Sequence, residues 1–338
     1  MRSGACLAST VTRRPDAPLL EVDRLTTVFR LADGLEAAAV DDVSFAIERG
    51  KTVALVGESG SGKSVTALSI IGLVQPPGRI AAGSVRLDKV DLLSLDDAGM
   101  QHVRGRRIGF IFQEPMVALD PVYTIGRQIA ETLAVHGLAR GAAARRRVQQ
   151  LLHAVRIPDP ERRAGEFPHQ LSGGLRQRAM IALALAAEPE LLIADEPTTA
   201  LDVTVQAEIL DLLDTLRREL NLAMLLITHD LGVVAEMADD VAVMYAGRIV
   251  ERGPVGLVFA APKHPYTQAL FASIPGAHAG TRLKAIDGNV PALGQAPAGC
   301  AFAPRCAHRF DPCDAPPPLF PVGDGHEARC FLHERVTA

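Results

Sequence analysis

Residues 57–64 read Gly-Glu-Ser-Gly-Ser-Gly-Lys-Ser, and this segment decides the fold class. It follows the apolar run 52–56 and leads into residues 65–70, a stretch typical of a helix. The three glycines let successive N–H groups turn inward, and the start of the following helix adds partial positive charge. Strand, glycine-rich loop and helix together predict a cradle for phosphate oxygens.

The loop also predicts how a nucleotide would be held. We expect Lys63 to hold the β- and γ-phosphates and Ser64 to offer its hydroxyl to Mg²⁺. An ordinary flexible Gly/Ser turn is the alternative, and the flanking strand and helix disfavour it. The sequence therefore predicts a nucleoside triphosphatase. The other loop positions expected to bind the nucleotide are Gly57, Ser59, Gly60, Ser61 and Gly62.

Composition limits what else the chain can be. Its 338 residues are 48% hydrophobic, which suits a globular protein, but no apolar run approaches the ~20 residues that span a bilayer. Residues 1–18 lack the apolar core of a secretory signal, so we expect a flexible tail on a cytoplasmic protein. A net charge of −4 argues against broad nucleic-acid binding. The basic run 145–147 is interpreted as the solvated face of a helix.

The order of apolar segments predicts the arrangement of the core. Strands are expected at 19–22, 43–47, 52–56 and 107–112, with one helix between them, and a helical insertion follows. After it, helices at 175–187 and around 205–216 alternate with buried strands at 191–194 and 223–227, which implies a parallel sheet. From about residue 256, proline and glycine rise, and this predicts an extension with little regular structure.

Two carboxylates end one of these strands. We expect Asp195 to order Mg²⁺ through water and Glu196 to polarise the water that attacks the γ-phosphate. Two ordinary acids before the turn at Pro197 are the alternative. Upstream, Ser172, Gly173 and Gly174 open a helix and present free N–H donors to an anion.

A phosphate loop followed by Leu171-Ser172-Gly173-Gly174-Leu175-Arg176-Gln177 and then by Asp195-Glu196 resembles the nucleotide-binding subunits of ABC transporters, over residues 19–255. The resemblance implies an α/β fold with a RecA-like P-loop core, an antiparallel β subdomain and an inserted helical subdomain at about 113–175. It also implies ATP and Mg²⁺ as ligands.

Further site residues are implied by this resemblance. Gln113 looks like the glutamine that touches Mg²⁺ and the attacking water, and His229 like the histidine that contacts the γ-phosphate, so both join Glu196 as catalytic residues. Asp202, in Ala200-Leu201-Asp202, resembles the D-loop aspartate. Phe29 stands where the family stacks an aromatic ring, usually Tyr, on adenine.

The resemblance also implies a mechanism. Two subunits face head to tail, and Ser172, Gly173 and Gly174 of one cap the γ-phosphate held by the other. Closing and opening of this pair would drive membrane subunits docked near Gln113. The expected partners are a second ATPase, as a paralogue, two transmembrane permease subunits and an extracytoplasmic binding protein, with no nucleic acid. The chain would lie at the cytoplasmic face of the cell membrane as a peripheral subunit.

Cysteines crowd the end of the chain, at Cys300, Cys306, Cys313 and Cys330. In a reducing compartment such a group favours a metal over disulfides. The spacing lacks the C-x-x-C pairs common in zinc sites, whereas an iron–sulfur cluster accepts more varied spacing. Zinc and free buried thiols are the alternatives.

Residues 256–338 resemble the C-terminal domain of ATPases that serve dipeptide, oligopeptide and nickel importers, because they carry His264-Pro265-Tyr266 and the stretch 299–306. In that family four such cysteines bind a [4Fe-4S] cluster, which would staple a proline-rich tail. We expect His264 to pack at a helix start rather than bind metal.

The expected function is thus an ATP-hydrolysing subunit of a bacterial di- or oligopeptide importer. An importer of nickel or another small solute is the alternative within the family. A soluble ABC ATPase acting on nucleic acid or ribosomes is disfavoured, since such proteins usually carry two modules, coiled coils or zinc insertions. A metal or redox sensor is disfavoured by Glu196 and His229.

Overall fold

The computed structural model describes residues 17–273 and 286–337. The predicted tail, residues 1–18, lies almost wholly outside the described residues. Among the helices within these ranges, none combines the length and the apolar character that a bilayer crossing requires.

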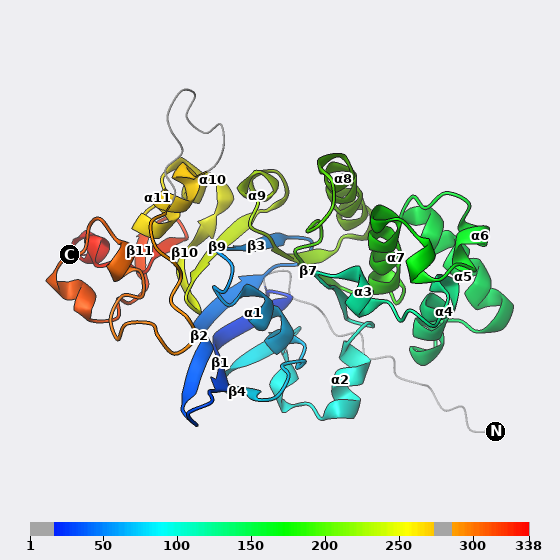
Figure 1. Ribbon diagram of the computed structural model, residues 1–338, viewed down its shortest axis with the longest axis horizontal. Coiled ribbons are helices and arrows are strands. Elements are labelled where there is room, and N and C mark those ends of the chain that lie inside the picture. Colours follow the sequence, from blue (N-terminus) through cyan, green and yellow to red (C-terminus); the bar gives the residue numbers. More distant parts are fainter. Residues whose placement is uncertain (1–16, 274–285, 338) are drawn as a thin grey trace, which may run out of the picture.

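An eight-stranded mixed sheet forms the centre of the molecule (Figure 1). Strand β3 (Thr52–Val56) lies in its middle, between β8 (Ala223–Ile227) and β9 (Asp240–Tyr245). Strands β7 (Leu191–Asp195) and β6 (Ile108–Ile111) continue the parallel part beyond β8. Every residue of β3, β7 and β8 is buried, as expected for parallel strands covered on both faces. The predicted parallel sheet is confirmed.

A second sheet of four antiparallel strands lies below the first in Figure 1. Its strands are, in chain order, β1 (Leu20–Arg30), β2 (Glu36–Ile47), β4 (Gly78–Leu87) and β5 (Val90–Asp91). Helix α1 (Lys63–Ile70) joins the two sheets through one apolar cluster. The sequence predicts one helix in this region, which is wrong, because a 3₁₀ turn (Leu92–Ser94) and α2 (Asp97–Val103) follow β5.

The predicted helical insertion is present and forms one end of the molecule (Figure 1). Its basic run lies on α5 (Gly141–Ala154), where Arg145 and Arg146 are exposed while Val148 and Leu152 are buried, as predicted. Helix α7 (Gly173–Leu185) leads back to β7, and α8 (Val203–Leu220) and α9 (Leu231–Met237) follow β7 and β8. The elements of the insertion are α3 (Pro115–Ala118), α4 (Ile125–Val135), α5 (Gly141–Ala154), α6 (Pro160–Ala164) and a 3₁₀ turn (Pro168–Gln170).

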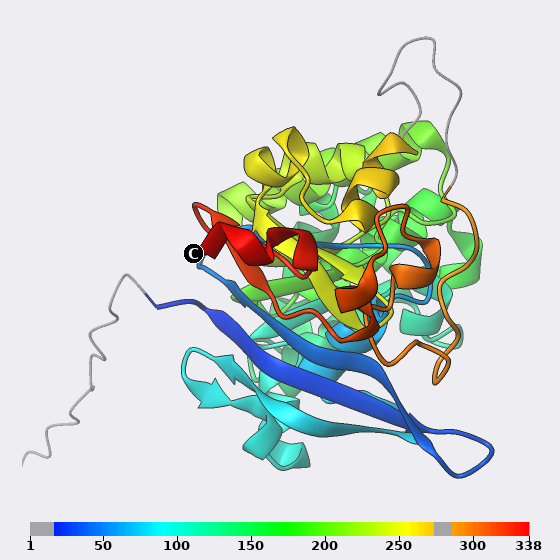
Figure 2. The same cartoon turned by 90° about the vertical axis from the view of Figure 1, so that its left-hand side faces the viewer.

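The C-terminal extension lies at the opposite end and faces the viewer in Figure 2. Its strand β12 (His326–Ala328) pairs with β10 (Arg248–Pro254), and β11 (Phe320–Gly323) pairs with β12, so the extension lengthens the central sheet. The prediction of an irregular extension is wrong in this respect. Its other elements are α10 (Val255–Ala260), α11 (Pro265–Ala272), and 3₁₀ turns at Ala303–Arg305, Asp311–Asp314 and Phe331–Thr337.

A buried carboxylate ties the extension to the sheet. Glu251 on β10 is fully buried and lies 2.7 Å from Nε2 of His326 on β12. It also accepts the backbone N–H groups of Lys263 and His264, at 2.7 and 2.8 Å. One buried side chain thus connects β12 with the start of α11, because a buried polar group is stable only when it is hydrogen-bonded.

An apolar cluster continues from the central sheet into the extension. Tyr245 of β9 packs against Tyr266 of α11 and Phe302, with ring centroids 4.7 and 5.3 Å away. His264 caps α11 by accepting the N–H of Tyr266 at 3.0 Å, and burial lowers its pKa to about 3. The interpretation of His264 as a helix-start residue is confirmed.

Candidate active site

Three chain segments meet at one edge of the central sheet. The phosphate loop follows β3, Asp195 and Glu196 end β7, and His229 follows β8. Since parallel strands present their carboxyl ends at the same edge, the topology gathers residues that are 131 positions apart, such as Ser64 and Asp195.

Two glycines of the loop are required by space as well as by backbone angle. Gly57 has φ +150°, and a Cβ there would lie 2.2 Å from the carbonyl oxygen of Met244. Gly62 has φ +103°, and its Cβ would lie 2.4 Å from the carbonyl oxygen of Ala39. Any side chain would therefore push the loop away from the neighbouring strands.

Lys63 lies inside the loop, with an exposed fraction of only 5%. Its Nζ donates to the carbonyl oxygens of Gly57 at 2.8 Å and of Glu58 at 3.0 Å. Burial lowers the pKa of Lys63, and the nearby carboxylates of Glu196, Asp195 and Glu58 act in the opposite direction. The ammonium group is thus held inside the curve of the loop.

Oxygen donors lie next to the loop, on the side of β7. The Ser64 hydroxyl donates to Oδ1 of Asp195 at 3.0 Å. Burial raises the pKa of Asp195, and the Ser64 hydrogen bond lowers it in part. A hydroxyl, a carboxylate and the amide of Gln113 are the hard oxygen ligands that Mg²⁺ takes alongside phosphate and water, so this donor set fits the predicted ion.

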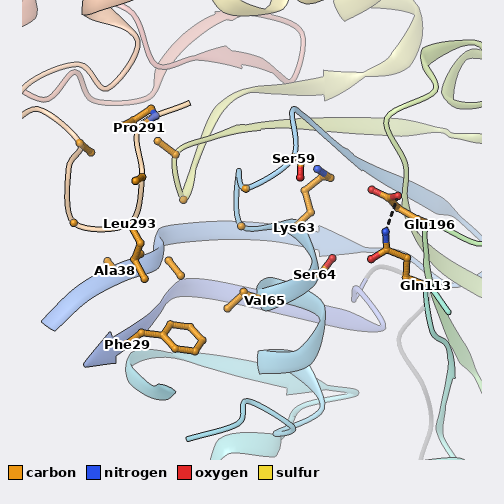
Figure 3. A pocket seen from close by; sticks show the side chains of 18 residues that line it. Phe29, Ala38, Ser59, Lys63, Ser64, Val65, Gln113, Glu196, Pro291 and Leu293 are labelled. Atoms are coloured by element: carbon orange, nitrogen blue, oxygen red, sulfur yellow. Dashed lines mark hydrogen bonds between the residues drawn. The ribbon is translucent and has the colours of Figure 1, made fainter. Parts of the chain in front are cut away.

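Glu196 is held by three side chains. Its Oε2 accepts the Gln113 amide at 3.2 Å and the Thr199 hydroxyl at 2.7 Å, and lies 3.6 Å from Nδ1 of His229. Figure 3 shows Gln113 and Glu196 pointing toward each other beside the loop. The sequence prediction missed Thr199, although a hydroxyl three residues after a carboxylate is a common local partner.

The backbone of Glu196 is also constrained. Its φ is +46°, an uncommon conformation for a residue with a side chain. Its N–H donates to the carbonyl oxygen of Ile227 at the end of β8, at 2.9 Å. Such strain is typical of functional positions, and here it aims the carboxylate across the strand ends.

A cavity of about 390 Å³ covers the loop. Its polar end contains Ser59, Gly60, Gly62, Lys63, Ser64, Gln113 and Glu196. Its apolar end contains Phe29 and Ala38, as Figure 3 shows, together with residues 291–294 and Ala296 of the C-terminal extension. The predicted Phe29 therefore lies where a base attached to loop-bound phosphates would reach. The sequence prediction missed the contribution of the extension.

Residues 171–177, here called the signature segment, and the D-loop aspartate Asp202 do not line this cavity. Ser172 and Gly173 are exposed at the start of α7, where the Ser172 hydroxyl accepts the N–H of Leu175 at 3.4 Å. Asp202 is exposed at the start of α8, where it accepts the N–H of Val205 at 3.0 Å. Neither segment thus contributes to the cavity over the phosphate loop of its own chain.

None of the four cysteines of the extension forms a disulfide bond. Across residues 17–273 and 286–337, no group of three or more His, Cys, Asp or Glu side chains is arranged to hold a metal ion. Burial raises the pKa of Cys300, Cys306 and Cys330, the last to about 11. The structure gives no support for the predicted [4Fe-4S] site.

Two protein families match separate parts of the chain. The ABC transporter family matches residues 40–199, and the family described as the C-terminal region of oligopeptide/dipeptide transporters matches residues 250–313. A relative from Brucella ovis, named as a peptide import ATP-binding protein, is 52% identical over 335 residues, which cover 95% of this chain and 99% of the relative. A Brucella melitensis protein of the same designation is 50% identical over 315 residues, covering 93% and 95%.

Solved structures agree with these relatives. A dimeric ATP-binding cassette in a post-hydrolysis state with ADP and Pi is 29% identical, with a TM-score of 0.62 over 70% of this chain and 98% of that one. The cbiO1 subunit of an ABC transporter complex from Clostridium perfringens is 30% identical, with a TM-score of 0.61 over 72% and 91%. The chain has the ABC ATPase fold, and it belongs to the ATP-binding subunits of ABC transporters of the oligopeptide and dipeptide type.

Proposed function

We propose that this chain hydrolyses ATP to drive the import of di- or oligopeptides into a bacterial cell. The observation that carries the hydrolytic part is Glu196, whose carboxylate is held between Gln113, Thr199 and His229 beside the phosphate loop. The peptide cargo is supported by the names of relatives that match nearly the whole chain. Those names favour peptides over nickel or another small solute.

The residues of the site have distinct roles in this proposal. Lys63 and the loop N–H groups bind the β- and γ-phosphates, and Phe29 stacks on the adenine ring. Ser64, Asp195 and Gln113 hold Mg²⁺, which, when bound, neutralises charge that develops on the phosphates. These residues fix the γ-phosphate near the strand ends.

Glu196 then acts on the attacking water. Its carboxylate accepts the water proton or orients the water in line with the γ-phosphate, and Gln113 and Thr199 keep that carboxylate in place. His229 is 3.6 Å from Glu196 and has an exposed fraction of 68%, so its ring is free to contact the γ-phosphate.

The second half of the site comes from another subunit. Ser172 and Gly173 are exposed, Gly174 is half-buried, and all three lie outside the cavity, which supports a head-to-tail pair in which they cap the γ-phosphate of the partner. Asp202 lies in the same interface. ATP closes the pair and hydrolysis opens it, which moves permease subunits docked near Gln113.

The proposed assembly follows from this mechanism. It contains a paralogous ATPase, two transmembrane permeases and an extracytoplasmic binding protein, with this chain peripheral at the cytoplasmic face of the membrane. No observation on the described residues favours nucleic acid or ribosomes as partners.

Replacing Glu196 tests the catalytic proposal. The variant Glu196→Gln should lower phosphate release by about 10³-fold while ATP binding and the closed dimer persist, because only the proton acceptor is lost. Lys63→Ala should weaken ATP binding instead. Glu219→Gln, an exposed change on α8, is the matched control and should leave both unchanged. Hydrolysis at the original rate in Glu196→Gln would exclude Glu196 as the essential carboxylate.

Uptake by the whole complex tests the cargo. Vesicles containing the assembled transporter should accumulate a labelled dipeptide or oligopeptide only with ATP, and the Glu196→Gln complex should not. Uptake of nickel but not of peptides would contradict the proposed substrate class.

A further inference from the structure

The C-terminal extension forms one wall of the nucleotide cavity. Residues 291–294 and Ala296 line the cavity together with Phe29 and Ala38. Figure 3 shows Leu293 next to Ala38, on the side of the loop where Phe29 lies and away from Gln113 and Glu196. Leu293 has an exposed fraction of 40%, which is high for a leucine that lines a cavity. An apolar side chain is thus exposed at the apolar end of the cavity, away from the residues that are proposed to bind the phosphates.

An arginine fixes this wall to the phosphate loop. The Arg305 side chain has an exposed fraction of only 6%, and its guanidinium lies 3.2 Å from the carboxylate of Glu58 in the loop. The same guanidinium donates to the carbonyl oxygens of Ile286 at 3.2 Å and Asp287 at 2.8 Å. These two residues begin the described part of the segment that leads to Leu293, so its start is held at a fixed distance from the loop.

The other side of the wall meets the antiparallel sheet. Gly294 has φ +80°, and a Cβ there would lie 2.9 Å from Cδ1 of Leu31 and 3.4 Å from Cβ of Ala37. The segment therefore approaches the β1–β2 hairpin closely, a few residues from Phe29. It is held from both sides.

We propose that Leu293 packs against the base of the bound nucleotide together with Phe29, so that the extension contributes directly to nucleotide affinity. This inference depends on the proposed binding of ATP in the cavity. Phe29 offers an aromatic face and Leu293 offers aliphatic surface, and both gain by removing the base and themselves from water. A substitution of Leu293 should leave phosphate binding unchanged, because Leu293 lies at the other end of the cavity.

Comparing the binding of ATP with that of inorganic tripolyphosphate distinguishes contacts to the base from contacts to the phosphates. Displacement of a fluorescent nucleotide from the full chain gives a dissociation constant for each. We expect Leu293→Ala to weaken ATP binding about fivefold, the effect of losing roughly one side chain's apolar contact, and to leave tripolyphosphate unchanged. Leu293→Met, which keeps the apolar volume, should restore ATP binding.

Two further variants serve as controls. Phe29→Ala should behave like Leu293→Ala, with a loss for ATP only. Leu332→Ala removes a leucine of the same extension that is 48% exposed but does not line the cavity, and it should change neither constant.

Failure of the inference differs from failure of the proposed function. If Leu293→Ala binds ATP like the original protein while Phe29→Ala loses affinity, the base is bound but Leu293 does not contact it. If Leu293→Ala weakens both ligands equally, it acts on the phosphate loop and the inference is wrong. If the original protein binds neither ligand, or if Lys63→Ala leaves both constants unchanged, the proposed nucleotide site itself is wrong.

Discussion

Burial makes the charged form costly for two ionisable groups, Lys63 in the phosphate loop and Asp195 beside it. It lowers the pKa of Lys63 and raises that of Asp195, so in both residues it disfavours the charged form. In the proposed function each charge meets a ligand of opposite sign, namely phosphate for Lys63 and Mg²⁺ for Asp195. Without ligand, the site therefore stores unfavourable free energy, as functional sites commonly do.

Removing the Asp195 charge should stabilise the protein while abolishing activity. Because the pKa of Asp195 is higher in the folded chain than in the unfolded one, the free energy of unfolding falls as pH rises through the range between the two values. Asp195→Asn keeps an oxygen for Ser64 and should raise that free energy by about 1 kcal/mol at pH 7.5, with a smaller gain at acidic pH. Urea denaturation measures it.

A cap residue supplies the control for this experiment. Asp202→Asn replaces an exposed N-cap by one of equal quality, so its stability should not change at either pH. A less stable Asp195→Asn at pH 7.5 would mean that the hydrogen bond to Ser64 outweighs the cost of burying the charge.

The thiols of the extension give a second prediction at this scale. Burial raises the pKa of Cys330 to about 11, so its thiolate fraction should rise about tenfold per pH unit up to that value. Alkylation of the native protein, followed at Cys330 by mass spectrometry, should accelerate accordingly, whereas the denatured chain should react fast already at pH 8.5. A thiol that resists alkylation at every pH, with release of iron or zinc on acidification, would contradict the free-thiol state.

Sequence patterns predict the residues that act within one motif, and they fail where a partner is remote. Lys63, Asp195 and Glu196 follow from a loop or a strand end that can be read locally. Arg305 and Glu58 are 247 residues apart, and nothing in either neighbourhood indicates the other. Leu293 is an ordinary leucine until the extension places it beside Ala38 and Phe29.

At the scale of elements, the start of α7 rests on α8. A Cβ at Gly174 would lie 2.8 Å from Cγ1 of Val205, whereas a Cβ at Gly173 would lie 3.6 Å from Cδ2 of Leu201. The distance at Gly173 is an ordinary van der Waals contact, whereas the distance at Gly174 is too short for a Cβ atom. In the signature segment, the packing of α7 against α8 therefore excludes a side chain at Gly174 but not at Gly173.

Substituting the two glycines separately should reveal this difference. Gly174→Ala forces Val205 or α7 to move and should cost about 1–3 kcal/mol of unfolding free energy. Gly173→Ala should leave stability within about 0.5 kcal/mol. Chemical denaturation of both variants measures the pair, and equal losses would show that the α7–α8 contact tolerates a methyl group.

The elements that could be predicted are those with a clear apolar pattern. Strands β3, β7 and β8 are continuous buried runs, so their positions agree closely with expectation. Strands β11 and β12 are only four and three residues long and follow a proline-rich stretch, so no periodicity marks them. Strand β12 joins the sheet by pairing with β10, where His326 meets the buried Glu251, and these are tertiary contacts.

At the scale of the whole molecule, the extension and the helical insertion lie at opposite ends of the long axis (Figure 1). The nucleotide cavity lies between them and takes residues from the central sheet, the antiparallel sheet and the extension. Gln113 lies just before α3, the first helix of the insertion, whereas the extension lines the Phe29 end of the cavity.

Breaking the buried pair that attaches the extension should destabilise the molecule. Glu251→Ala leaves His326 and two backbone N–H groups without their partner, at a cost of about 3 kcal/mol. Glu327→Ala on the same strand removes a half-exposed pair with Arg252 and should cost less than about 1 kcal/mol. Urea midpoints compare the two, and a mild effect of Glu251→Ala would show that the sheet holds β12 without this carboxylate.

The contact between Arg305 and Glu58 bears on how such proteins can be recombined. The two family matches leave a boundary between residues 199 and 250. A chimera could be built there by joining the N-terminal part of one relative to the C-terminal part of another. In this chain Arg305, in the C-terminal part, forms an ion pair with Glu58 in the phosphate loop of the N-terminal part. A graft that carries an arginine at this position without an acid to receive it would leave a buried cation unmatched, so donor and acceptor must be inherited together.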